Sequence, residues 1–127
     1  MIVVDTSALI AILKNEPAAD ACQRRLEQEE VVLISAGTLT EACVVAAQNG
    51  LYALLRALLK DAAVQCVALS EADALAAGEA YSRWGKNNHE AKLNFGDCFA
   101  YTLAKSRNCP LLYVGNDFAQ TDIASAI

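Results

Sequence analysis

Residues 1–10 read MIVVDTSALI, and this stretch decides the fold class. The run IVV is entirely apolar, as in strands that are covered on both faces. The segment 6–14 that follows, TSALIAILK, predicts a short helix with Thr6 or Ser7 near its N-cap. Asp5 separates the two elements and is the first charge in the chain. The stretch therefore predicts a buried strand that ends at a carboxylate and leads straight into a helix.

The same alternation of strand and helix continues along the chain. Strands are expected where short apolar runs occur, and helices where apolar residues recur at helical spacing. Strands are predicted at 2–4, 31–35, 64–69 and 111–115, and helices at 6–14, 17–30, 36–50, 51–62, 71–84 and 95–108. This order is typical of an α/β fold with a parallel sheet and helices on both faces. No repeat or linker interrupts it, so we expect residues 1–127 to form a single domain.

The composition narrows the class of protein. The chain has 15 acidic and 10 basic residues and a formal net charge of −5, which argues against general attraction to nucleic acid. A local acidic site can still meet nucleic acid through a bound metal. No membrane span or secretory signal is evident, so we expect a cytoplasmic protein. Its five scattered cysteines form no C-x-x-C pair, and with one histidine they predict reduced, mostly buried thiols and no zinc cluster.

Four acidic residues stand apart because no other charge lies near them in the sequence. They are Asp5, Glu41, Asp97 and Asp117. A carboxylate in an apolar setting is costly unless it is paired, caps a helix or binds a metal. Asp5 and Asp117 each follow a predicted strand, at the sheet edge where parallel α/β sheets bind ligands. We expect Glu41 near that edge, whereas the pattern does not place the end of the helix that carries Asp97.

A shared metal would explain why several such acids occur together. Carboxylates that are brought together repel one another, and a divalent cation removes the repulsion. Oxygen ligands alone favour Mg²⁺ or Mn²⁺, whose bound water can attack a phosphodiester. Single residues also have structural explanations: Asp97 as a helix N-cap and Asp117 as an Asx-turn residue. Glu41 has the weakest such explanation, because it lies inside an apolar helix.

Four motifs resemble those of the PIN-domain ribonucleases, and most of all the VapC-type toxins of bacterial type II toxin–antitoxin modules. The motifs are VVDTSAL, LTEA, NFGDCFAYTLAK and LLYVGNDFAQTDI, and they span the length of the chain. The resemblance implies a three-layer α/β/α fold with a central parallel sheet. It also implies a Mg²⁺-dependent endoribonuclease, with Mn²⁺ as an alternative ion, that a cognate VapB-type antitoxin neutralises.

The resemblance assigns roles to the solitary acids. Asp5, Glu41 and Asp97 match the family's three most constant acids, and Asp117 matches the more variable fourth. Many relatives read Gly-Asp-Asp-Phe where this chain has Gly-Asn-Asp-Phe, and Asp122 also matches a recurring acid, so the fourth position stays open with Asp117 favoured. Asp5 and Asp97 are expected to hold the metal, with Glu41 and Asp117 binding it directly or through water.

Two hydroxyls complete the resemblance. Thr6 and Ser7 match the family's hydroxyl positions after the first acid, where they would orient Asp5 or a bound water. In the mechanism that the resemblance implies, the metal activates a water that attacks the scissile phosphorus in line.

The loop between the last two predicted helices, RWGKNNHEAKLN, has two interpretations. It could grip RNA through Arg83, Trp84, Lys86 and Lys92, with Trp84 stacking on a base. It could equally be a solvated loop with Trp84 packed on its own helix. The acidic net charge favours a selective enzyme that reads a structured loop, such as part of tRNA or rRNA. The apolar second and third helices predict a homodimer.

Two other classes of function are weighed against the ribonuclease. A phosphotransfer enzyme with an acidic Mg²⁺ site would need D-x-D after the first strand, or an isolated nucleophilic Asp after the third, and neither pattern occurs. No Gly-rich phosphate loop is present. A PIN-like domain that only binds RNA or protein is the non-enzymatic alternative, and the presence of all four acids argues against it.

Overall fold

The opening stretch folds as strand β1 (Ile2–Val4), followed at once by helix α1 (Thr6–Leu13), in a computed structural model that describes residues 1–127. All three residues of β1 are fully buried. Asp5 is the N-cap of α1, since its side chain accepts a hydrogen bond from the Ser7 N–H. The cap was expected one or two residues later, at Thr6 or Ser7. The carboxylate takes that place because it lies at the strand-to-helix junction in an extended conformation.

The central sheet is parallel, as predicted, and β1 lies inside it. Its other strands are β2 (Val32–Ser35), β3 (Gln65–Val67) and β4 (Leu111–Leu112), in the order β3-β2-β1-β4. Register pairs Val3 with Leu33 on one side and with Leu111 on the other. β1 and β2 are buried, whereas β3 is an edge strand with exposed and half-buried residues.

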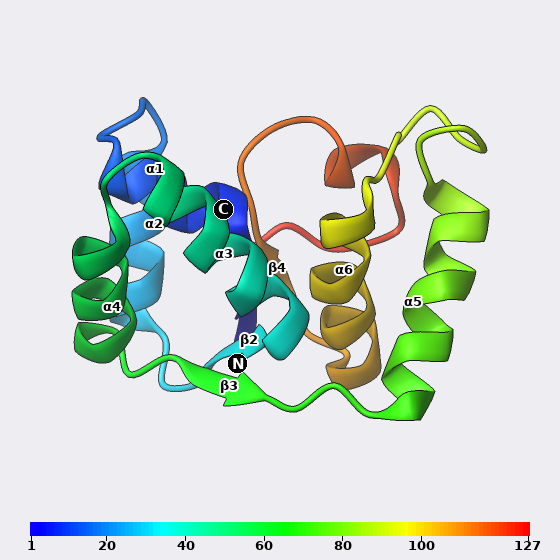
Figure 1. The fold of residues 1–127 in the computed structure, drawn as a ribbon, viewed down its shortest axis with the longest axis horizontal. Helices are drawn as coiled ribbons and strands as arrows, with labels where there is room; N and C mark the ends of the chain where they lie inside the picture. The colour runs from blue at the N-terminus through cyan, green and yellow to red at the C-terminus, as the bar shows by residue number, and fades with distance from the viewer.

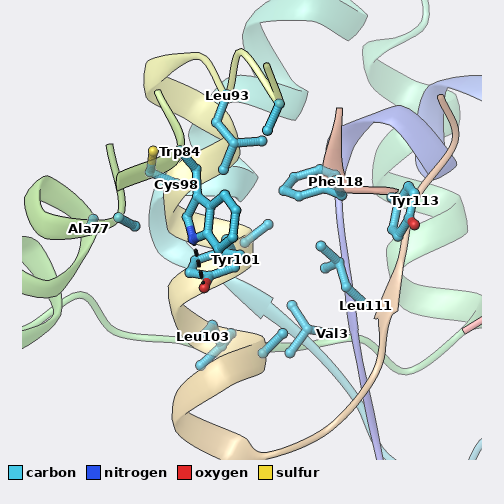
Figure 2. Close-up of a cluster of buried hydrophobic side chains, with 14 of the residues drawn as sticks. Val3, Ala77, Trp84, Leu93, Cys98, Tyr101, Leu103, Leu111, Tyr113 and Phe118 are labelled. Atoms are coloured by element: carbon cyan, nitrogen blue, oxygen red, sulfur yellow. Dashed lines mark hydrogen bonds between the residues drawn. The ribbon is translucent and has the colours of Figure 1, made fainter. Parts of the chain in front are cut away.

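Helices cover both faces of the sheet and make three layers (Figure 1). They are α1, α2 (Ala19–Gln28), α3 (Ala36–Gln48), α4 (Tyr52–Asp61), α5 (Glu71–Trp84) and α6 (Phe95–Arg107), with a short 3₁₀ helix η1 (Phe118–Gln120) near the C-terminus. Alternate side chains of β1 enter different cores. Ile2 and Val4 pack with α1 to α4, whereas Val3 packs with α5 and α6 in the cluster that Figure 2 shows.

Several element boundaries differ from the predicted ones. The strand predicted at 111–115 ends at Leu112, because its one strand neighbour β1 ends at Val4. The strand predicted at 64–69 is reduced to Gln65–Val67. The helix predicted from Pro17 begins at Ala19, with Pro17 in the turn before it. The other helices lie within two residues of their predicted ends.

The cysteines are free, and their burial varies. Cys22 and Cys98 are buried, Cys43 and Cys109 are half-buried, and Cys66 is exposed. The prediction of mostly buried thiols is therefore wrong for Cys66, because β3 is an edge strand. Among the helices, none has the length and apolar character needed to cross a membrane.

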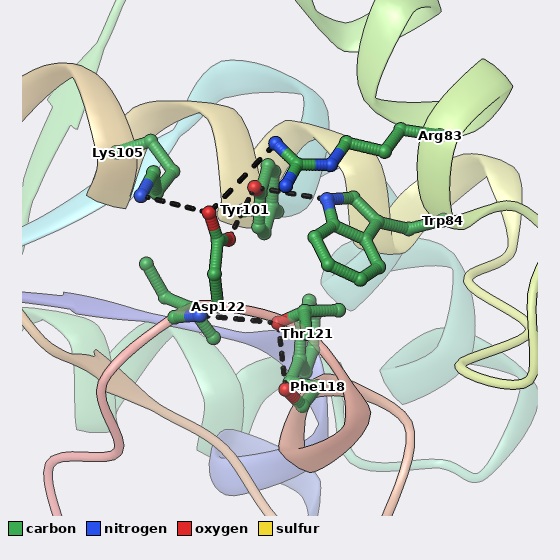
Figure 3. A network of polar contacts seen from close by, with 8 residues as sticks. Arg83, Trp84, Tyr101, Lys105, Phe118, Thr121 and Asp122 are labelled. Carbon is green, nitrogen blue, oxygen red and sulfur yellow. Dashed lines mark hydrogen bonds and ion pairs between the residues drawn. The ribbon is translucent and has the colours of Figure 1, made fainter.

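A polar network ties the C-terminal segment to α5 and α6 (Figure 3). The Tyr101 hydroxyl accepts a hydrogen bond from Trp84 Nε1 at 3.0 Å and donates one to Asp122 Oδ1 at 2.6 Å. Lys105 donates to the other carboxylate oxygen of Asp122 at 3.2 Å, and Arg83 lies 3.9 Å from that oxygen. The network joins two helices to the segment after η1 through one buried tyrosine.

Replacing Tyr101 by Phe should destabilise the protein by about 1–3 kcal/mol, because the buried Trp84 N–H loses its acceptor and Asp122 loses a donor. Urea unfolding measures this change. Tyr113→Phe is the matched control, since Tyr113 is also buried but its hydroxyl makes no hydrogen bond within the protein. Equal effects of the two substitutions would show that the network contributes nothing specific.

Candidate active site

The four solitary acids come from four separate elements. Asp5 follows β1, Glu41 lies in the second turn of α3, Asp97 lies in the first turn of α6, and Asp117 directly precedes η1. Asp5 still pairs with the sheet, since its N–H donates to the Leu112 carbonyl at 2.9 Å. The charges of Asp5, Glu41 and Asp117 all act to raise the pKa of Asp97. The charges of the other three acids thus reach Asp97, although the four carboxyls do not surround a common point.

Asp5 is the most buried of these acids, with 2% of its surface exposed. Its Oδ2 accepts hydrogen bonds from the Ser7 N–H at 3.0 Å and the Ser7 hydroxyl at 2.7 Å. Its Oδ1 is buried without any partner. Burial raises the pKa of Asp5 to about 6, the charge of Glu41 adds to the rise, and the Ser7 hydrogen bonds oppose it. A buried carboxylate oxygen without a donor is costly, and a cation would remove that cost.

Ser7 links Asp5 to the end of the sheet. Its hydroxyl donates to Asp5 and accepts a hydrogen bond from the Val114 N–H at 3.0 Å, two residues beyond β4. The expected orienting role is therefore seen for Ser7. Thr6 acts differently, because its hydroxyl donates to the Thr38 carbonyl at 3.4 Å and so joins α1 to α3.

Asp97 is both a helix-capping residue and a site acid. Asn94 is the N-cap of α6, and its Oδ1 accepts from the Asp97 N–H at 2.9 Å. Asp97 Oδ2 in turn accepts from the Asn94 N–H at 2.9 Å, which completes a capping box. The N-cap considered for Asp97 itself thus belongs to Asn94. Burial raises the pKa of Asp97 to about 7 against the effect of this hydrogen bond, and the neighbouring acids add to the rise.

Glu41 reaches the group from the opposite helix. Its side chain is half-buried and lies against Gly96, the residue before Asp97. Neither Gly96 nor Asn94 was singled out from the sequence. The spacing of Asn94 and Asp97, an N-cap residue three before an acid, is a capping-box signal that identifies Asn94. The role of Gly96 depends on a contact between two helices that no sequence pattern reveals.

Asp117 and Asp122 occupy different environments. The carboxylate of Asp117 is exposed and caps nothing, which excludes the Asx-turn explanation. Asp122 is instead held by Tyr101, Lys105 and Arg83, and these contacts lower its pKa, the Tyr101 hydrogen bond most of all. Asp122 was considered as a supporting site acid, and these contacts favour a structural role for it instead. Its negative charge is already matched by two cations.

The loop before α6 offers fewer RNA contacts than expected. Trp84 is 8% exposed, and Arg83 lies 4.5 Å from the centre of its ring while also facing Asp122. Of the two interpretations of Trp84, the buried one is therefore favoured, because its N–H donates to Tyr101 of α6 and His89 packs edge-on against its ring. Lys86 and Lys92 are exposed. These two lysines remain the loop's available cations.

The donor set fits a hard divalent cation. The side chains do not already surround a common point, since no three His, Cys, Asp or Glu side chains form a complete metal-binding group. Mg²⁺ does not need such a group, because it usually binds one or two carboxylates and keeps several waters. The unpartnered Oδ1 of Asp5 and the mutual repulsion at Asp97 both favour a cation here.

Metal-free protein should lose stability as the pH rises from 5 to 8. The pKa values of Asp5 and Asp97 rise from 3.8 to about 6 and about 7, so the folded state binds more protons than the unfolded state in this window. Urea unfolding in EDTA should show a fall on the order of 1–3 kcal/mol. Asp5→Asn should reduce the fall, whereas Asp122→Asn should keep it, because a lowered pKa acts below this range. A stability that rises with pH would contradict the described burial.

This chain is similar to known proteins in sequence and in fold. A model of the PIN domain matches residues 2–124. Ribonuclease VapC30 of Mycobacterium tuberculosis (strain ATCC 25618 / H37Rv) is 44% identical over 126 residues, covering 97% of this chain and 96% of that ribonuclease. The crystal structure of Mycobacterium tuberculosis VapC20, a Sarcin-Ricin loop cleaving toxin, has a TM-score of 0.77 at 17% identity and covers 98% of this chain and 97% of that chain. A chain of a toxin–antitoxin complex from Klebsiella pneumoniae has a TM-score of 0.75 at 18% identity, covering 100% of this chain and 98% of that chain. The chain therefore belongs to the PIN-domain family and, within it, to the VapC-type ribonucleases.

Proposed function

We propose that this protein is a Mg²⁺-dependent endoribonuclease that acts as the toxin of a type II toxin–antitoxin module. The observation that carries the metal site is the buried Asp5 Oδ1, which has no partner and lies within reach of the charges of Glu41 and Asp97. Ribonucleases of this family generally depend on a divalent metal. The oxygen-only donor set supports Mg²⁺, with Mn²⁺ as the alternative.

Each site residue has a distinct task. Asp5 and Asp97 would hold the ion, and Glu41 and Asp117 would bind it directly or through water. When bound, Mg²⁺ supplies an activated water and neutralises the charge that develops on the phosphate. Ser7 keeps Asp5 Oδ2 occupied, which leaves the buried Oδ1 without a partner and available to an ion. The Asn94 N–H fixes Asp97 in the same way, with one oxygen engaged.

The acid cluster also makes the reaction conditional on the ion. Four carboxyls repel an approaching phosphodiester as long as their charge is not neutralised. Because the pKa values of Asp5 and Asp97 lie near 6 and 7, protons compete with the metal for these ligands close to neutral pH. Both effects support an enzyme that binds RNA at this edge only with the metal in place.

The substrate and partners follow from charge and exposure. The net charge of −5 and the few free cations, Lys86 and Lys92 among them, support a structured RNA target such as a loop of tRNA or rRNA.

The predicted VapB-type antitoxin would place an Arg or Lys against the carboxylates in place of the metal. Exposed Val44 and Leu75 support a homodimer, and the free thiols support a cytoplasmic location.

Asp5→Asn should abolish Mg²⁺-dependent RNA cleavage while the protein stays folded, because it removes a charged ligand without changing side-chain size. The assay is cleavage of total cellular RNA, with EDTA as the metal-free control and far-UV circular dichroism as the check on folding. Asp20→Asn is the matched control, since Asp20 is exposed on α2, on a helix that bears none of the four acids. Cleavage by the Asp5 variant at the wild-type rate would leave only a binding function for this domain.

Asp117→Asn and Asp122→Asn should separate the two acids that compete for the fourth position. Asp117→Asn should lower cleavage at limiting Mg²⁺ and leave the unfolding midpoint unchanged, because the side chain is exposed and has no protein partner. Asp122→Asn should lower the midpoint, since its ion pairs are lost, and should leave Mg²⁺ dependence unchanged. The reverse pattern would assign the fourth position to Asp122.

A further inference from the structure

Helices α3 and α6 meet through two glycines, each of which receives a side chain from the opposite helix. Gly96 of α6 faces the Glu41 carboxylate, and Gly37 of α3 faces the Phe99 ring. Gly37 and Glu41 are four residues apart on α3, and Gly96 and Phe99 are three apart on α6. Residues at these spacings share a helix face, so the two contacts belong to one crossing.

We propose that Gly96 is a positioning residue, which holds the Glu41 carboxylate beside Asp97 by leaving the space of a side chain empty. This role rests on the proposed metal-dependent function, because it concerns the ligands of that site. Gly96 would affect the reaction only through the position of Glu41, without touching the substrate itself.

The space at Gly96 is the first support. A Cβ at this position would lie 1.8 Å from Glu41 Oε2, 2.5 Å from its Cδ and 3.1 Å from its Oε1. Atoms that are not bonded to each other cannot approach so closely, so any side chain at position 96 would force the carboxylate to move. The Glu41 carboxylate therefore occupies the space that the Cβ of any other residue at position 96 would fill.

The backbone gives no other reason for a glycine here. Gly96 lies in the first turn of α6 and is not among the residues with a positive φ. Glycine is less favourable than alanine in a helix, because it loses more conformational freedom. Its presence in a buried first turn is thus explained by the contact with Glu41 and by no local requirement.

The second glycine fixes how the two helices cross. A Cβ at Gly37 would lie 2.5 Å from Phe99 Cγ, so the aromatic ring sits directly on the α3 backbone. Phe95 packs edge-on against that ring, with centroids 5.0 Å apart. With this crossing fixed, the Glu41 side chain meets the backbone of α6 one residue before Asp97. The space beside Gly96 is thereby open to the Glu41 carboxylate.

The consequence of adding a methyl group differs between the two positions. At Gly96 the colliding atoms are the free end of a flexible side chain, so Glu41 can swing away and α6 can keep its place. At Gly37 the colliding atoms belong to a packed ring, so the helices themselves must shift. Gly96→Ala should therefore move the Glu41 carboxylate while the helices keep their places.

The test compares Gly96→Ala with Gly78→Ala, a matched control in the middle of α5 where a Cβ would meet nothing within 4 Å. Gly96→Ala should shift the carboxyl ¹³C resonance of Glu41 in metal-free protein and should weaken Mg²⁺ binding, measured by calorimetry, about tenfold or more. Gly78→Ala should do neither. In a Glu41→Ala background, adding Gly96→Ala should have no further effect on Mg²⁺ affinity.

The outcomes separate this inference from the proposed function. If wild type binds Mg²⁺ and Gly96→Ala binds it equally well with an unmoved Glu41 resonance, Gly96 is not a positioning residue. If wild type binds no Mg²⁺ but the Glu41 resonance still shifts in Gly96→Ala, the metal function fails and the positioning role stands. If Gly96→Ala lowers the urea midpoint, adding Glu41→Ala should restore it, and a failure to restore it would overturn the inference.

Discussion

The burial of the Asp5 carboxylate at the end of the central strand is the constraint on which the rest of the structure depends. β1 has strands on both sides and helices on both faces, so the residue that follows it has little access to water. A carboxylate in that place needs donors, a proton or a cation. Ser7 supplies hydrogen-bond donors to one oxygen of Asp5. The pKa of Asp5 is nevertheless raised, because these donors do not replace all the water that burial removes. The charge of Glu41 raises the pKa of Asp5 further, which supports the proposal that a cation binds here.

Much of this was predictable because the signals are local. A run of apolar residues between turn signals predicts a strand, and the alternation with helices predicts a parallel sheet. An acid with no charge near it in the sequence is visible without any structure, and the charges of Asp5, Glu41 and Asp117 all act on Asp97. Ser7 was predictable for the same reason, since it lies two residues from Asp5.

The features that sequence reasoning missed depend on contacts between distant elements. The sequence left open whether Trp84 is packed or available to RNA, and the answer depends on Tyr101, seventeen residues later, which gives its N–H a buried acceptor. The sequence suggests Asp122 as a site acid, and only the structure reveals its ion pairs with Lys105 and Arg83. The length of β4 depends on where its neighbour ends, and the use of Gly96 depends on the crossing of α3 and α6. No pattern within one segment carries that information.

The early end of β4 has a consequence for how the site can vary. Three of the four acids are attached to regular elements, at a strand end and within two helices, so their positions are set by the core. The fourth follows a stretch that has left the sheet at Leu112 and passes through Gly115, whose φ of +109° is a conformation that glycine adopts more readily than other residues. An acid supplied from such a stretch can come from neighbouring positions without disturbing the fold. The same architecture can thus accept a change in the position of one acid while the positions of the other three stay fixed.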